Sequence, residues 1–247
     1  MTLQDVRRVV DAPARVPYRF GLFSVISFVP DERAAGGVAW DSLGCLVPGT
    51  ITDDCIVVGG GDGTMPATNI ECADKTVNPF TVVSFDESSL GRPPRSASPG
   101  RAQARLIAGE QTAVETELSG YLVTGATDIT VAASGLATQL GEMEHALAEQ
   151  GSEGVIVVRR SVIAAMPDYF MQTGSMLRTK LGTPVAALGG WTPASPLTIF
   201  GVPSFIGHRS AVSVGTGWNR AINDVSEYAE RDYAIGWDCT ALTATAA

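Results

Sequence analysis

The sequence predicts an α+β fold, with short strands dominating its first third and helices alternating with strands after residue 100. Three observations lead to this prediction. An apolar stripe of helical period precedes a β-branched run between residues 135 and 191. A second helix-length segment follows a Gly- and Pro-rich breaker at residues 91–100. Before that breaker, short β-branched runs are separated by Gly and Pro, as is typical of strands and turns.

Residues 19–90 are expected to be rich in strands and loops, after an extended arm at residues 1–18 that mixes charged residues with proline. Apolar runs predict strands at Phe20–Val29, Val38–Trp40 and Phe80–Val83.

A long helix is predicted from Arg101 to about Leu122, because Ser98 and Pro99 suit a helix cap and first turn. Its predicted apolar stripe consists of Ile107, Val114, Leu118 and Leu122. Residues 127–132 are expected to form a short strand after it.

Residues 135–191 are predicted to form a compact module of helix, strand, helix and strand. The first helix carries its apolar residues on one side and can end at Gly151, and the run 154–158 predicts a strand buried on both faces. Ser161 can cap a second helix that Pro167 interrupts. The apolar residues of the first helix are Leu136, Leu140, Met143 and Leu147.

The remaining segments are predicted from shorter patterns. Residues 181–188 read as a strand ending at Gly189-Gly190, and residues 197–214 read as strand-like with Gly and Pro interruptions. Residues 221–230 are expected to form a short helix, and residues 232–242 a final strand.

The composition argues against a nucleic-acid-gripping surface. The net charge is −9, and lysine occurs only at Lys75 and Lys180. The pair Arg159-Arg160 is too sparse for a phosphate-binding patch and reads as a solvated surface pair, whereas an acidic wall can enclose DNA without adsorbing it. Charged residues make up only 17% of the chain, which is typical either of a protein that hides surface against neighbours or of a well-packed enzyme.

No metal, cofactor or catalytic site is predicted. The four cysteines lack metal-ligand spacing, and His145 and His208 are expected at the surface or at an interface. Glu142, Glu144 and Glu149 read as a solvated face. With no apolar run of membrane-spanning length and no signal peptide, the chain is expected to be soluble and intracellular where it is made.

Roughly residues 100–240 resemble the major capsid proteins of tailed double-stranded-DNA phages, most closely those of actinobacterial phages. The likeness rests on a Gly-ended helix followed by GVIVV at 154–158, on LRTKLGTPVAALGGW at 177–191, and on the closing segments GWNRAIN at 217–223 and YAERDYAIGWD at 228–238. It implies the Hong Kong phage capsid-type fold, shared with encapsulins: N-terminal arm, extended β-hairpin loop, long spine helix, and peripheral and axial subdomains.

The resemblance implies a structural subunit, not an enzyme, that forms hexamers and pentamers of an icosahedral head around double-stranded DNA. It implies a virion protein assembled in the host cytoplasm, with a separate scaffolding protein, portal and decoration proteins as further partners. It divides the chain into an arm at 1–18, an extended-loop region at 19–90, a linker and spine helix at 91–133, an axial module at 134–195 and core-completing strands at 196–247.

Two other functions stay open. An encapsulin-like nanocompartment shares the fold but encloses protein. A small-molecule kinase is the alternative of a different class, because Gly59–Thr64 contains GGDGT, whose glycines could approach phosphate. A Gly-rich turn is the simpler interpretation, since no helix is expected upstream. A Lys–Asn isopeptide bond between subunits is not expected, since Lys75 is the one lysine near the loop, with Asn219 and Asn223 as the nearest late asparagines.

Overall fold

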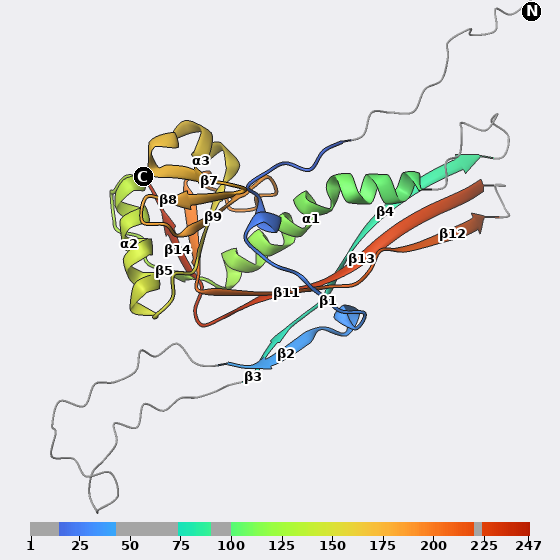
Figure 1. Cartoon of the computed structure of the whole chain (residues 1–247), viewed down its shortest axis with the longest axis horizontal. Helices are drawn as coiled ribbons and strands as arrows, with labels where there is room; N and C mark the ends of the chain where they lie inside the picture. Colours follow the sequence, from blue (N-terminus) through green and yellow to red (C-terminus); the bar gives the residue numbers. More distant parts are fainter. Residues whose placement is uncertain (1–14, 43–73, 90–99, 220–223) are drawn as a thin grey trace, which may run out of the picture.

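The computed structural model describes residues 15–42, 74–89, 100–219 and 224–247, and these form two regions that lie end to end (Figure 1). An α/β module lies at one end and a long antiparallel sheet extends away from it. The helix α1 (Arg101–Gly125) runs along that sheet and reaches the module. The base of a β-hairpin, β2 (Val38–Asp41) with β3 (Asp74–Val77), projects from the opposite side of the sheet to α1.

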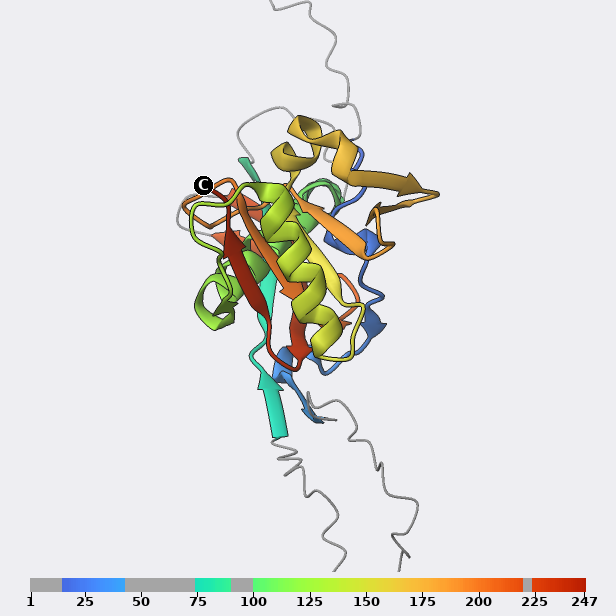
Figure 2. The ribbon, with the colours of Figure 1, turned by 90° about the vertical axis from the view of Figure 1, so that its left-hand side faces the viewer.

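The module is built on a seven-stranded sheet with the order β5-β14-β10-β6-β9-β8-β7. Helix α2 (Leu136–Glu149) covers one face of it, as Figure 2 shows. The short helix α3 (Arg160–Ala165) and the turn η3 (Pro167–Tyr169) follow β6. The strands are β5 (Thr127–Asp128), β6 (Val155–Arg159), β7 (Phe170–Thr173), β8 (Met176–Thr179), β9 (Pro184–Leu188), β10 (Thr198–Val202) and β14 (Leu242–Thr245).

The core of the module fills both faces of this sheet. The predicted stripe of α2 is buried, and it packs against Ile156, Val158 and Ile199. Gly201 permits the close approach of α2, because a Cβ there would lie 2.3 Å from the Met143 sulfur. On the other face, Val157 and Phe200 pack toward α1. The central strands are therefore buried on both sides, as the run 154–158 predicts.

The long sheet has β13 (Asp224–Asp238) as its central strand. It pairs along one side with β4 (Phe80–Ser89) and along the other with β11 (Ser204–Arg209) and β12 (Ser213–Asn219) in succession. The two-residue strand β1 (Val29–Pro30) adds to β11. Alternate residues of β13 face α1, so Ala229, Arg231 and Tyr233 are covered by the helix layer.

Helix α1 forms as predicted, but its buried stripe differs. Leu106 is buried with Val114, Leu118 and Leu122, whereas Ile107 is 45% exposed and lies on the solvent side. The predicted stripe was wrong at this position. Leu106 and Ile107 are adjacent and both apolar, so the sequence alone does not tell which of them packs against the sheet. Gly100 is the N-cap residue, while the predicted cap at 98–99 lies outside the described residues.

The predicted strand at Phe20–Val29 is wrong. A 3-10 turn, η1 (Leu22–Ser24), lies within it, turns and irregular backbone form the rest, and only its last residue joins β1. Phe20 has a positive φ of 64°, and Leu22 and Ile26 are buried against α1. The run is apolar because its side chains pack into the core between α1 and the two sheets, not because it forms a β-strand. A second 3-10 turn, η2 (Ala34–Gly36), leads into β2.

The predicted helix at 221–230 is also wrong, since residues from Asp224 onward belong to β13. Pairing with β4 and β12 on both sides overrides the local helix preference of the Ala- and Glu-containing segment. The expected strand 232–242 splits into the end of β13 and the start of β14, and Cys239 between them has a positive φ of 61°.

Smaller corrections concern the module. Arg159, not Ser161, is the N-cap residue of α3. The strand expected at 181–188 begins only at Pro184, and the hairpin β7–β8 before it was not predicted. The strand expected at 127–132 is confined to β5, and 197–214 forms β10 and β11 and only starts β12.

Candidate functional site

The described residues hold no group of three or more His, Cys, Asp or Glu that could bind a metal ion. Within the same residues, no helix is long and apolar enough to cross a membrane. The Gly59–Thr64 motif lies outside the described ranges. His145 is exposed and lies 3.4 Å from Glu149, and His208 on β11 lies 3.2 Å from Asp31. The features described next are the buried polar clusters that join distant segments and the apolar side chains that remain exposed.

A joint between three distant segments is centred on Glu115, a fully buried residue of α1. Its Oε1 accepts hydrogen bonds from the Leu22 backbone (2.9 Å) and from Gln111 Nε2 (3.1 Å). Its Oε2 accepts from the backbones of Gly189 (2.6 Å) and Gly190 (3.2 Å) and from the Tyr18 hydroxyl. Five donors thus satisfy a buried carboxylate, which ties residues 15–24, here called the arm base, to α1 and to the turn after β9.

Glycines allow this close approach. A Cβ at Gly190 would lie 2.3 Å from the Thr112 carbonyl oxygen of α1, and one at Gly189 would lie 2.5 Å from the Tyr18 hydroxyl. A Cβ at Gly21 would overlap the Gln111 side chain. The Gly189-Gly190 pair, predicted only as a strand end, therefore lets the backbone donors reach Glu115.

Further contacts fix the arm base to the module. Arg160 Nη1 donates to the Arg19 carbonyl (2.6 Å), and its guanidinium lies 5.0 Å from the centre of the Tyr18 ring. The Ala187 backbone on β9 donates to the Phe20 carbonyl (2.7 Å). Burial, together with the neighbouring Glu115 carboxylate, raises the pKa of Tyr18 to about 12, so its hydroxyl stays protonated and donates.

A second buried carboxylate on α1, Glu110, joins the helix to β13. It accepts from Arg231 Nη1 at 2.9 and 3.2 Å and from the Tyr233 hydroxyl at 3.0 Å. Burial and the Glu110 charge raise the pKa of Tyr233 to about 12. Here a cation compensates the carboxylate, whereas the five donors to Glu115 are all uncharged.

The base of the β2–β3 hairpin packs on β13 at Gly236. A Cβ there would lie 2.2 Å from Val77 and 2.9 Å from Trp40. Beside this contact is a hollow of about 320 Å³, lined mainly by aromatic and aliphatic side chains including Trp40, Tyr121 and Trp237. Lys75 Nζ donates to the Cys239 carbonyl (2.9 Å), so this lysine is engaged within its own chain.

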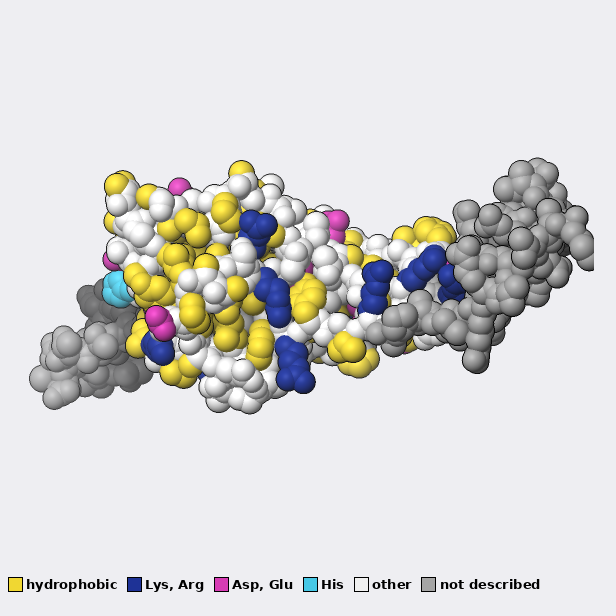
Figure 3. Space-filling model, turned by 90° about the horizontal axis from the view of Figure 1, so that it is seen from above, with side chains coloured by type: hydrophobic (Ala, Val, Ile, Leu, Met, Phe, Trp, Pro, Cys, Tyr) yellow, Lys and Arg dark blue, Asp and Glu magenta, His cyan; other side chains and the backbone are white. Residues whose placement is uncertain are grey.

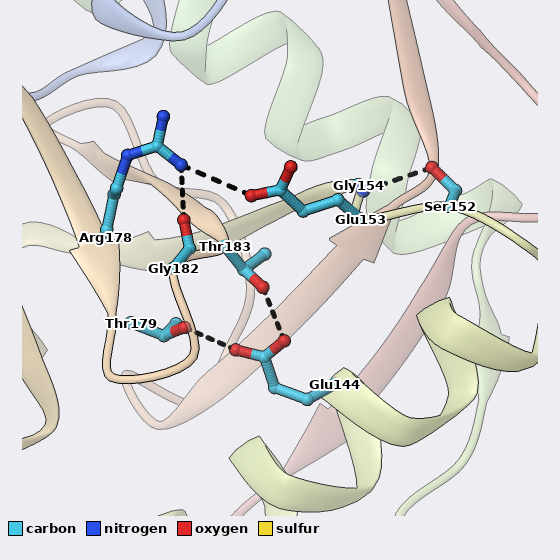
Figure 4. Close-up of polar contacts among 8 residues, drawn as sticks. All are labelled: Glu144, Ser152, Glu153, Gly154, Arg178, Thr179, Gly182 and Thr183. Atoms are coloured by element: carbon cyan, nitrogen blue, oxygen red, sulfur yellow. Dashed lines mark hydrogen bonds and ion pairs between the residues drawn. The ribbon is translucent and has the colours of Figure 1, made fainter.

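A polar cluster holds the turn between β8 and β9 against α2 (Figure 4). Glu144 accepts from the Thr179 and Thr183 hydroxyls, each at 2.5 Å, so the expectation of a fully solvated glutamate face is wrong at this residue. Arg178 donates to the Gly182 carbonyl and lies 3.3 Å from Glu153.

Large apolar side chains are exposed where these elements project. At the tip of the β8–β9 turn, Leu181 is 80% exposed, and Val16 in the arm base is 88% exposed. On β4, Val83 and Phe85 are 45% and 57% exposed. They pair with Glu230 and Tyr228 of β13, on the face of the long sheet away from α1. No described element covers that stretch of the sheet.

No family model matches the sequence, and a sequence search of curated proteins finds no match. Solved structures do match over almost the whole chain. The capsid of a native GTA particle aligns with a TM-score of 0.64 and 13% identity, covering 99% of this chain and 96% of that one. The SrpI encapsulin of Synechococcus elongatus aligns at 0.60 and 10%, covering 98% and 92%, and a chain of Microbacterium phage Oxtober96 at 0.54 and 13%, covering 100% and 96%.

The chain has the phage capsid fold. The predicted α+β capsid architecture, shared with encapsulins, is thereby confirmed at the level of fold. Within it, α1 corresponds to the expected spine helix and β2–β3 to the base of the expected hairpin loop. The joint at Glu115 and the Glu144 cluster were missed. For α1 a signal existed: Glu110, Gln111 and Glu115 alternate with Val114 and Leu118 on the buried side of the helix.

Proposed function

We propose that this chain is the major capsid subunit of a tailed phage, forming hexamers and pentamers of an icosahedral head that encloses double-stranded DNA. The capsid fold over the whole chain supports this, because capsid shell proteins share it. We also propose that the subunit assembles in the host cytoplasm, with scaffolding, portal and decoration proteins as partners. Residues 1–18 would act as the arm, 19–90 as the extended-loop region, 91–133 as linker and spine, 134–195 as the axial module and 196–247 as the closing strands.

The observation that carries the proposal is the uncovered apolar face of the long sheet. Val83 and Phe85 are exposed on the same face of one strand. Adjacent exposed apolar side chains are typical of surfaces that contact another chain. A neighbouring subunit that covers this face would bury both side chains. If the covering element lies elsewhere on the subunit, the contact is heterologous, and a heterologous contact whose rotation closes forms a ring, as five- and six-fold capsomers require.

Negative-stain microscopy with light scattering on the expressed chain tests this function. Wild-type protein should form rings, sheets or shells tens of nanometres across. Phe85→Glu should leave a folded subunit that does not assemble, because a charge would be buried at the contact. Ile107→Glu is the matched control, since Ile107 is similarly exposed but lies on α1. Equal assembly by the Phe85→Glu variant would contradict the proposed interface.

An encapsulin-like shell is the second candidate, because the SrpI encapsulin matches the chain over nearly its whole length. The contents of purified particles distinguish the two. Protein cargo without nucleic acid would favour the nanocompartment. Double-stranded DNA in particles from phage-infected cells would favour the head. Nucleotide turnover that Asp62→Ala abolishes would instead favour the kinase alternative.

A further inference from the structure

Several cationic side chains are visible on the face of the molecule that carries α1 and the arm base (Figure 3). Asp and Glu side chains also appear on this face. The whole chain carries a net charge of −9, so a local group of unpaired cations stands out against it.

Four arginines where the arm base meets α3 are the centre of this face. Arg160 contacts both Tyr18 and the Arg19 carbonyl, which places the two segments side by side. All four are exposed, and none forms an ion pair with a carboxylate of the described residues. They are Arg15, Arg19, Arg159 and Arg160.

The charges along α1 are more nearly balanced. Arg101 and Arg105, at the start of the helix, lie 3.4 and 2.9 Å from a single carboxylate, Asp86, and Glu227 accepts a hydrogen bond from the Gly100 backbone beside them. Farther along the helix, Glu110 pairs with Arg231, Glu115 is buried and Glu117 is exposed. The excess of positive charge therefore lies at the four arginines and not along α1.

The opposite face of the long sheet has the reverse character. Neighbouring residues of β13 point to opposite faces, so Glu230 and Asp232 point away from α1 while Arg231 between them pairs with Glu110. Among the described residues, the Asp232 carboxylate accepts a hydrogen bond from the neutral Thr81 hydroxyl (2.6 Å). The sheet face therefore carries carboxylates, whereas the four unpaired arginines lie where the arm base meets α3.

We propose that the basic patch defined by Arg15, Arg19, Arg159 and Arg160 lines the inside of the shell and contacts the phosphates of the enclosed DNA. This inference rests on the proposed function. Exposed, unpaired guanidinium groups are suited to phosphate oxygens, and contacts to phosphate require no base sequence. This proposal departs from two expectations: that Arg159-Arg160 is too sparse to bind phosphate, and that an acidic wall encloses DNA without adsorbing it.

Salt-dependent binding of a short labelled DNA duplex of mixed sequence to full-length subunits tests the inference by fluorescence anisotropy. The logarithm of the binding constant falls with the logarithm of salt concentration, with a slope of about −0.9 per phosphate contact. Arg19→Gln and Arg159→Gln should each reduce the magnitude of that slope by about 0.9. Neither side chain holds a described neighbour, so folding should persist. Arg33→Gln, the same charge change at the exposed end of η2, should leave the slope unchanged.

Three results would overturn the inference. The first is a slope that Arg33→Gln lowers as much as Arg159→Gln does. The second is displacement of the duplex by poly-glutamate at equal charge concentration, which would assign the face to an acidic protein segment. The third is a wild-type chain that forms shells but binds no duplex. In that case the proposed structural function would stand while the inference failed. The anisotropy measurement needs no assembly, so DNA binding and shell formation are tested separately. Failure to form shells would count against the proposed function alone.

Discussion

The α/β module and the long sheet treat apolar side chains in opposite ways. Every residue of β10 in the module is buried, because α2 covers one face of its sheet and α1 reaches the other. On β4 of the long sheet, α1 covers Val82 while Val83 and Phe85 on the other face stay exposed. The core of the module is complete within one chain. The long sheet is covered by described elements on one face only, and its other face is the one that the proposed function assigns to a neighbouring subunit.

The largest expected effect is the difference in the free energy of unfolding between Phe200→Ala and Phe85→Ala. Phe200 is buried between β10 and α1, so its truncation should lower the free energy of unfolding by about 3–5 kcal/mol. Phe85 is exposed in the single chain, so its truncation should change that free energy by no more than about 0.5 kcal/mol. Urea denaturation of unassembled subunits measures both. Similar losses for the two variants would show that the sheet face is covered within one chain.

The two regions meet at Glu115, and Glu115→Gln should weaken their connection. In the variant, the amide N–H₂ group would replace one carboxylate oxygen and face backbone N–H donors that it cannot accept from. The unsatisfied donors should lower the free energy of unfolding by about 1–3 kcal/mol. The loss should fall on the arm base, since Tyr18 and Leu22 are held there. Limited proteolysis should therefore cut residues 15–24 faster in the variant.

Glu117→Gln is the control for this change, because it removes an exposed carboxylate two residues away on the same helix. It should leave the cleavage rate of the arm base as in the wild type. Equal acceleration in both variants would mean that helix charge, and not the buried joint, sets the position of the arm base.

How much of this could be predicted from the sequence follows the same division. In the module, the helix at 136–149 and the strand at 155–159 were predicted because their periodicity reflects local burial. Phe20–Val29 and 221–230 were predicted wrongly because distant segments decide their structure. The Leu22 backbone donates a hydrogen bond to Glu115, 93 positions away, and β13 is a strand because it pairs with β4, which lies far before it in the sequence. Glu115 also accepts from Gly189, 74 positions after it. Because its donors lie far from it on both sides of the sequence, no local pattern predicts this joint.

The smallest expected effect is on the pH dependence of stability, and it concerns the tyrosines that donate to the two buried carboxylates, Tyr18 to Glu115 and Tyr233 to Glu110. The pKa values of Tyr18 and Tyr233 are both raised to about 12, first by burial and then by the neighbouring glutamate. A phenol whose pKa is raised on folding stabilises the fold below its unfolded pKa of 10.0, and this contribution is lost as pH rises from there through about 12. Tyr18→Phe should therefore make stability less sensitive to pH over that window, while Tyr233, which Arg231 partly compensates, still contributes. Unfolding free energies measured across the window should fall less steeply in the variant than in the wild type. Parallel curves would mean that the Tyr18 hydroxyl is not held against Glu115 in solution.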